Sequence, residues 1–358
     1  MIRRSSAFLG SLVLLALAAA PAGAANISSA NGYVVRNLES DVPGRAMHTD
    51  PDLVNGWGIT ASGSSPWWVA DNGTGLSTLY NTASGTDATK LGLVVSVSGD
   101  GGPAAPTGAV FNGNAAFPVT AGGTDFARFI FDSEDGTVSA WAGRSASTVE
   151  VIAPDHAIYK GLAIGTSGGH PYLYANDFHN AKVDVYDGAF ALQHWAGAFV
   201  DPGIPSGFAP FGIQNIGGTI YVTYAKQDAD REDEIAGDGL GYVSAFGTDG
   251  SFLGRIASGG SLNAPWGLAM APAGWQKFAD NLLVGNFGDG RIHGYAPTST
   301  GWEDRGPLKL ENHNPIVIDG LWGIGFGNGA ASGPVTTLYF AAGPDDEAHG
   351  LFGSISSE

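Results

Sequence analysis

A glycine followed by an apolar residue recurs six times along the chain, at intervals of 50, 53, 51, 55 and 56 residues. A period of this length indicates one small structural unit that is repeated and stacked. The repeating glycines are Gly58, Gly108, Gly161, Gly212, Gly267 and Gly323. We therefore expect six copies of one unit.

Each unit has room for four short strands. A second run rich in β-branched and aromatic residues follows each glycine, as at 172–175, and an Asp, Asn and Gly turn comes next. A third run such as 182–186 and a fourth such as 91–97 or 148–152 complete the unit. Short strands separated by turn residues predict antiparallel hairpins. Four of them in about 50 residues predict a propeller blade, and thus an all-β, six-bladed β-propeller.

The two ends of the chain are complementary. The sixth unit has only three residues after 351–355, so it lacks its fourth strand. A strand without a unit, Tyr33 to Leu38, precedes the first repeated glycine. We expect this N-terminal strand to be the outermost strand of the last blade, because ring closure then leaves no unfinished edge.

The first residues have the features of an export signal. Arg3 and Arg4 precede an apolar stretch at 7–20, and Ala22-Gly23-Ala24 is a small-residue cleavage motif. This arrangement predicts a signal peptide at 1–24 and a single propeller domain at 25–358. No second long apolar stretch follows. We expect a secreted or periplasmic protein without a membrane anchor.

The charge limits the partners of the chain. There are 16 Lys and Arg against 34 Asp and Glu, which gives a net charge of −18. Such a charge repels nucleic acid and anionic lipid surfaces. The chain has no Cys, which excludes disulfides and thiol catalysis. We expect a monomer that binds a small molecule, a glycan or a protein.

Strand alternation predicts where a site would form. In a four-stranded blade, the loop leading into the first strand and the loop joining the second and third strands lie on one face, called the top face below. Such convergent loops commonly carry the site. The candidate ligand-binding residues on the top face are His48, Asp50, Asp71, Asn72, Asp132, Lys160, Asn176, Asp177, His179, Lys226, Asp228, Asn286 and His313. Any single Asp among them also fits a purely structural role in a turn.

Lys160 interrupts an apolar pattern. The residue before the repeated glycine is Lys160 in the third unit, whereas the other five units have Trp57, Thr107, Phe211, Trp266 and Trp322. Lys160 would bind an anionic group or pair with an Asp of the top face. The alternative is a solvated ammonium whose stem packs on aromatic rings.

An acidic insertion occupies 227–241 in the fourth unit. Asp228, Asp230 and Glu232 alternate as at the start of a calcium loop, but an EF-hand would require Gly and Glu where Asp233 and Gly239 stand. The mismatch favours a solvated lid.

Three segments carry a resemblance to a known family. They are residues 48–59 (HTDPDLVNGWGI), 68–75 (WVADNGTG) and 226–230 (KQDAD). Through these segments the chain resembles an uncharacterised family of bacterial exported six-bladed propellers. Some members end in a Pro-Glu-Pro sorting tail, whereas this chain ends at Ser356-Ser357-Glu358. The resemblance implies the fold and export, and it assigns no catalytic residue.

The blade pattern at 173–186 and 284–292 is also similar to NHL-type repeats, which metal-dependent lactonases share. Those lactonases place Asn before the repeated glycine, and Lys160 departs from this.

Two functions therefore remain open. The first is a binding scaffold without turnover. The second is a metal-assisted hydrolase, lactonase or lyase using carboxylates and imidazoles of the top face, with Asp71, Asp177 and His179 as metal candidates. Carboxylates favour Ca²⁺ and added imidazoles favour Zn²⁺. No cofactor is required by the sequence.

Overall fold

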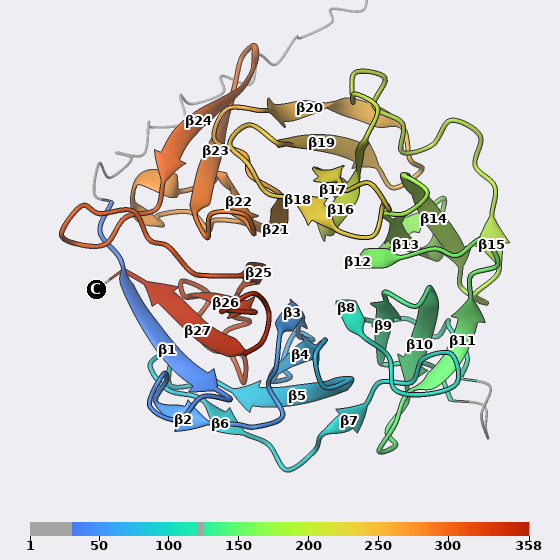
Figure 1. Ribbon diagram of the computed structural model, residues 1–358, viewed down its shortest axis with the longest axis horizontal. Helices are drawn as coiled ribbons and strands as arrows, with labels where there is room; N and C mark the ends of the chain where they lie inside the picture. The colour runs from blue at the N-terminus through green and yellow to red at the C-terminus, as the bar shows by residue number, and fades with distance from the viewer. Residues whose placement is uncertain (1–30, 120–124, 358) are drawn as a thin grey trace, which may run out of the picture.

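The computed structural model describes residues 31–119 and 125–357. They form six antiparallel sheets arranged as blades around a central axis, and the first strands of the blades are innermost (Figure 1). The predicted all-β, six-bladed β-propeller is confirmed. The predicted signal peptide at 1–24 lies outside the described residues.

The first three blades follow one another along the chain. Blade 1 contains β3 (Gly56–Thr60), β4 (Trp67–Asp71), β5 (Leu76–Asn81) and β6 (Thr89–Lys90), with β7 (Val95–Ser96) also paired to β5. Blade 2 contains β8 (Pro106–Phe111), β9 (Phe129–Ser133), β10 (Thr137–Trp141) and β11 (Thr148–Ile152). Blade 3 contains β12 (Tyr159–Ser167), β13 (His170–Asp177), β14 (Lys182–Asp187) and β15 (Leu192–Gln193).

The last three blades add two variations. Blade 4 contains β16 (Phe208–Ile216), β17 (Thr219–Gln227), β19 (Gly241–Gly247) and β20 (Phe252–Ser258), with the short β18 (Glu234–Ile235) on β17. Blade 5 contains β21 (Pro265–Met270), β22 (Leu282–Asn286), β23 (Ile292–Thr298) and β24 (Gly301–Pro307), and a 3₁₀ turn, Gln276–Phe278, precedes β22. Blade 6 contains β25 (Leu321–Phe326), β26 (Leu338–Ala342), β27 (Leu351–Ser356), β1 (Val34–Ser40) and β2 (His48–Thr49).

Blade 6 joins the two ends of the chain. The N-terminal strand β1 pairs antiparallel with the C-terminal strand β27, from Val34 opposite Ser356 to Ser40 opposite Leu351 (Figure 1). This confirms the predicted closure. The strand β2 adds a further, parallel partner outside β1.

The repeated glycines allow neighbouring blades to approach at the axis. A Cβ built on any of the six would lie less than 3.0 Å from a backbone atom of the next blade. Gly58, for example, faces the carbonyl oxygen of Thr107, and Gly323 faces that of Trp57. The six contacts run once around the ring, so any side chain at these positions would push the inner strands apart.

Aromatic residues fill the axis toward the top face. The rings of Trp57 and Trp322 stack with centroids 3.6 Å apart, and Phe211 packs edge-on against Trp322 at 5.7 Å. Below them the channel narrows to a cavity of about 30 Å³ between the inner strands. The axis is therefore nearly closed below these rings.

No helix among the described residues has the length and apolar character needed to span a membrane.

Candidate functional site

Lys160 lies at the centre of the top face, where the surrounding blades leave its side chain almost inaccessible to solvent. It opens β12 at the position where four other blades place Trp or Phe, and its side chain is 2% exposed. The ammonium lies 5.2 Å from the ring centroid of Trp57. The backbone carbonyl of Lys160 accepts a hydrogen bond of 2.7 Å from Trp266 Nε1. Trp57 and Trp266 therefore hold the ammonium and the backbone of Lys160, respectively.

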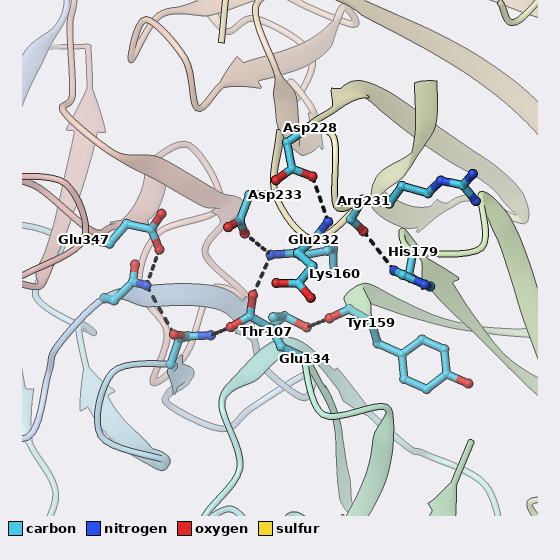
Figure 2. A network of polar contacts seen from close by, with 12 residues as sticks. Thr107, Glu134, Tyr159, Lys160, His179, Asp228, Arg231, Glu232, Asp233 and Glu347 are labelled. Atoms are coloured by element: carbon cyan, nitrogen blue, oxygen red, sulfur yellow. Dashed lines mark hydrogen bonds and ion pairs between the residues drawn. The ribbon is translucent and has the colours of Figure 1, made fainter. Parts of the chain in front are cut away.

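Two carboxylates neutralise the buried ammonium. Lys160 Nζ lies 2.5 Å from Glu134 Oε1 and 3.1 Å from Asp233 Oδ1 (Figure 2). Burial by itself lowers the pKa of Lys160, but the field of Glu134 and its acidic neighbours outweighs burial and raises this pKa above its ordinary value. Lys160 is therefore a fixed positive charge at neutral pH.

A chain of polar contacts extends from this ion pair across the mouth, the name used here for Asn55, Asn72, Glu134, Lys160, Asp233, Glu234 and Glu347. Asn72 Nδ2 donates to Glu134 Oε2 at 2.9 Å, and Asn55 Nδ2 donates to Asn72 Oδ1 at 3.3 Å and to Glu347 Oε2 at 2.5 Å (Figure 2). Loops and strands of blades 6, 1, 2, 3 and 4 supply these residues. The mouth is consequently assembled by ring closure.

The loop that carries Glu347 is strained. Asp345, Asp346 and Glu347 have φ values of 58°, 52° and 64°, and Asn55 opposite them has φ 49°. Such left-handed conformations of non-glycine residues cost about 1–3 kcal/mol each and tend to cluster at binding sites. In this conformation Glu347 Oε2 accepts the hydrogen bond from Asn55 Nδ2.

The mouth holds more negative charge than Lys160 balances. Four carboxyl groups, those of Glu134, Asp233, Glu234 and Glu347, interact with the single ammonium. Burial raises the pKa of Glu234 to about 8, although Lys160 acts in the opposite direction. Burial also raises the pKa of Glu347. A further cation would relieve this excess.

The raised pKa of Glu234 predicts a pH-dependent stability. Because the pKa is about 8 in the folded protein and 4.5 ordinarily, the stabilising contribution of Glu234 is complete below about pH 4.5 and lost as the pH rises through about 8. We expect Glu234→Gln to reduce the loss of unfolding free energy between pH 5 and pH 8 by about 1 kcal/mol or more, since one pKa unit equals about 1.4 kcal/mol. Urea denaturation at the two pH values measures it. Glu232 is exposed in the same loop, so Glu232→Gln is the control. The prediction is contradicted if the unfolding free energy changes equally between pH 5 and pH 8 in both variants.

A second acidic group contains Asp155, Asp177 and Asp184, whose ligand atoms lie within 4.8 Å of one another. Lys182 Nζ fills the centre, at 2.8, 3.5 and 2.6 Å from the three carboxylates in that order. A divalent ion would have to displace this ammonium, so these residues do not fit a resident metal. Of the predicted metal candidates, only Asp177 belongs to the group; Asp71 and His179 do not.

Several other predicted site residues stabilise the blades. Asp132 Oδ1 accepts hydrogen bonds from Gly108 N at 2.6 Å and from Thr107 Oγ1 at 2.9 Å, and burial raises its pKa to about 7. Asp71 Oδ2 accepts from Thr78 N at 2.8 Å. Asn176 donates to Phe211 O at 3.0 Å and Asn286 to Ser261 O at 2.8 Å. These contacts support the alternative that such Asp and Asn residues have a structural role in the turns of the blades.

Comparison with known protein-family models gives no match. An uncharacterized protein of Acanthamoeba polyphaga mimivirus is 32% identical over 338 residues, which cover 91% of this chain and 80% of the viral protein. A second uncharacterized protein of the same virus is 32% identical over 330 residues, covering 87% and 82%. This chain belongs to the same family as these two viral proteins. Membership in a family of bacterial exported propellers stays a prediction.

Solved structures share the fold at low identity. The structure of a streptogramin B lyase is 11% identical, with a TM-score of 0.53, and the match covers 90% of this chain and 97% of the lyase. The aldose sugar dehydrogenase of Escherichia coli is 12% identical, with a TM-score of 0.56, covering 91% and 100%. Likeness at this level concerns the propeller fold and carries no activity over to the family.

Three predicted site residues lie away from the mouth. His48 belongs to β2 at the outer edge of blade 6, where its Nε2 lies 2.7 Å from Asp87 Oδ1. Asp50 is buried against Lys90 at 2.5 Å and accepts a hydrogen bond from Tyr80 at 2.7 Å. His313 lies in an exposed turn that follows β24, the outermost strand of blade 5. None of the three contacts a residue of the mouth in the described part of the chain, and their role in ligand binding stays a prediction.

The remaining candidates lie in the mouth, beside the insertion or at a separate cavity. Lys160 and Asn72 belong to the mouth, and their role in ligand binding stays a prediction. His179 Nδ1 contacts the carbonyl oxygen of Arg231 at 3.3 Å, near the insertion (Figure 2). Lys226 and Asp228 line a separate cavity between blades 3 and 4.

The insertion 227–241 begins as a hairpin. β18 pairs with β17, and Asp228 N donates to Asp233 O at 2.9 Å. This hairpin brings Asp233 and Glu234 to Lys160, so the insertion contributes two carboxyl groups to the mouth, and its role as a lid stays a prediction. Sequence reasoning identified the insertion but missed Glu134, Glu347 and Asn55, whose only signal was a position in the loops of the top face.

Proposed function

We propose that this protein is a ligand-binding propeller that holds a small cationic molecule at the mouth. The observation that carries the proposal is that four carboxyl groups, those of Glu134, Asp233, Glu234 and Glu347, interact with the one ammonium of Lys160. A bound cation would stabilise the ionised forms of Glu234 and Glu347. Binding is thereby coupled to proton release.

The neighbouring groups support a small organic cation. Asn55 Nδ2 donates to Glu347 Oε2 and Asn72 Nδ2 donates to Glu134 Oε2, which fixes both carboxylates. Asn72 Oδ1 accepts from Asn55 Nδ2 at 3.3 Å, and its second lone pair would accept a hydrogen bond from an ammonium group. The Trp57 ring already lies beneath one ammonium, which shows that the aromatic base tolerates positive charge. The net charge of −18 would attract a cation from solution.

Calorimetric titration with putrescine, and separately with Ca²⁺, tests the proposal. We expect putrescine to bind with release of protons at pH 7. Glu234→Gln and Glu347→Gln should each weaken binding about 10-fold, since a hydrogen bond to a charged group contributes roughly 1.5–3 kcal/mol. Asp155→Asn, in the acidic group filled by Lys182, is the control and should leave binding unchanged.

Two results would overturn the proposal. The first is putrescine binding weaker than about 1 mM, which corresponds to only about −4.1 kcal/mol. The second is binding that neither glutamine substitution weakens. Binding of Ca²⁺ without putrescine would replace the organic cation by a metal site.

The second candidate function is a hydrolase, lactonase or lyase. It is favoured by Glu234, because a carboxyl group with a pKa of about 8 is protonated at neutral pH and suits a general acid. The test is turnover of lactone and ester substrates by wild type and Glu234→Gln, with elemental analysis for Ca and Zn. Turnover that Glu234→Gln abolishes would establish it, and turnover equal in both proteins would exclude this role for Glu234.

A further inference from the structure

A second hollow on the top face carries an excess of positively charged side chains, whereas the mouth is rich in carboxyl groups. It lies between blades 3 and 4, has a volume of about 500 Å³, and is bounded by the loop 199–208, by β17 and by the start of the insertion. Cavities of roughly 300–1,000 Å³ are of the size that holds small molecules. None of the residues that define the mouth lines this hollow, which is called the blade 3–4 cavity below.

The charged groups of the blade 3–4 cavity leave a positive excess. Lys226 and Arg231 both line it, and among the described residues neither has a carboxylate within ion-pair distance. Asp201 also lines it, but Arg255 neutralises this carboxylate through Nε at 2.8 Å and Nη2 at 2.5 Å. Asp228 is the remaining acid, and its Oδ1 accepts the backbone N–H of Glu232 at 2.9 Å. In a chain with a net charge of −18, two unpaired cations at one cavity are unexpected.

Tyr224 supplies the second observation. Its side chain is 4% exposed, lines the cavity, and its hydroxyl has no hydrogen-bond partner among the described residues. An unsatisfied buried hydroxyl costs about 1–3 kcal/mol, so such a group indicates a missing partner. Burial raises the pKa of Tyr224, which keeps the hydroxyl a donor. Tyr224 and Lys226 are two residues apart on β17, so both side chains point to the same face of the strand.

Apolar side chains form the rest of the wall. Phe199, Ile204, Phe208 and Pro210 line the cavity. The ammonium of Lys226 lies 5.3 Å from the ring centroid of Phe208, which holds it beside the apolar wall. A ligand that fills the cavity would therefore meet a cationic pole and an apolar surface together.

We infer that the blade 3–4 cavity is a binding site for a small monocarboxylate with an aromatic or alkyl body. The carboxylate would meet Lys226 and Arg231 and accept a hydrogen bond from the Tyr224 hydroxyl, while the body packs on Phe199 and Phe208. This ligand class has the charge opposite to that of the ligand proposed for the mouth. Substitutions in one site should leave the other unaffected.

Titration with phenylacetate, phenylacetamide and inorganic phosphate tests this inference on the full-length protein. We expect phenylacetate to bind and the neutral amide and phosphate to bind at least about 10-fold more weakly, a ratio worth about 1.4 kcal/mol. Lys226→Met should weaken phenylacetate binding by the same factor. Tyr224→Phe should also weaken it without lowering the melting temperature, because the hydroxyl it removes has no partner in the free protein.

Lys277 offers a matched control on another blade. Its ammonium lies 5.2 Å from the ring of Phe278, a stacking like that of Lys226 on Phe208, so Lys277→Met should leave binding unchanged. The inference is overturned if phenylacetate binding is not detected, if Lys226→Met and Lys277→Met behave alike, or if phosphate binds as well as phenylacetate. Glu347→Gln, which tests the mouth, should have no effect on phenylacetate binding.

Discussion

Removal of residues 33–40 is expected to destabilise the propeller severely and to make it associate. This deletion removes β1 and leaves β27 as an unpaired edge in blade 6. It also removes Leu38, fully buried with Tyr80 and Phe352, and Tyr33, buried against Trp275. Burying one large apolar side chain contributes roughly 1.5–3 kcal/mol, against a total stability of about 5–15 kcal/mol for a domain. We expect a loss of about 10 °C or more in melting temperature.

Thermal melts and size-exclusion chromatography measure these effects. The exposed edge of β27 should pair with other chains, so oligomers are expected besides the lower melting temperature. Deletion of residues 25–30 is the control and should change neither quantity. Leu38→Ala, with an expected cost of about 2–5 kcal/mol, tests the packing without breaking the strand. An unchanged melting temperature for the deletion of 33–40 would mean that β1 does not close the ring.

Replacement of Lys160 by Met is expected to cost about 3–5 kcal/mol at pH 8, the range found when one partner of a buried ion pair is removed. Methionine approximates the lysine stem, so the loss comes from the carboxyl groups of the mouth, which keep their charge without the ammonium. The cost should be smaller at pH 5, because Glu234 and Glu347 then carry protons more readily. Urea denaturation at both pH values measures the difference.

Two variants separate charge from packing in this result. Lys226→Met removes another lysine that stacks on an aromatic ring but has no carboxylate partner among the described residues, so its cost should stay below about 1 kcal/mol. Lys160→Met combined with Glu134→Gln should be more stable at pH 8 than Lys160→Met alone, because one uncompensated charge is gone. A cost for Lys160→Met that is equal at pH 5 and pH 8 would show that packing, and not charge, dominates.

The fold was predictable because its signals are local. Each repeated glycine lies within the innermost strand of its blade, where it allows the inner strand of the next blade to approach, and this holds in every blade. The fourth strand of blade 1 shows the limit of such signals. A single strand was expected at 91–97, but the chain makes two separate short pairings with β5, at β6 and β7. Apolar residues in a connection pack as well as those in a strand, so composition alone does not separate the two.

The mouth was only partly predictable. Lys160 stood out because it replaces an aromatic residue in an otherwise regular position, and Asn72 because it ends a strand on the top face. Glu134 and Glu347 have no such signal, because an acidic residue in a turn is ordinary in sequence. His48 and His313 were candidates on the top face, and the structure places His48 in the outermost strand of blade 6 and His313 in an exposed turn after β24. Sequence position defines which face a loop occupies, but not how far its side chains lie from the axis.

The sequence by itself determined the number of blades, the all-β class, and the pairing of the chain ends, since each depends on residue patterns within one unit or on one missing strand. Only the tertiary structure decided which charges meet. Four different blades supply the charged groups Glu134, Lys160, Asp233 and Glu347. Glu134 and Glu347 are more than 200 residues apart in the chain. Coulomb energy depends on distances of a few ångströms and on burial. Those quantities exist only once the ring has closed.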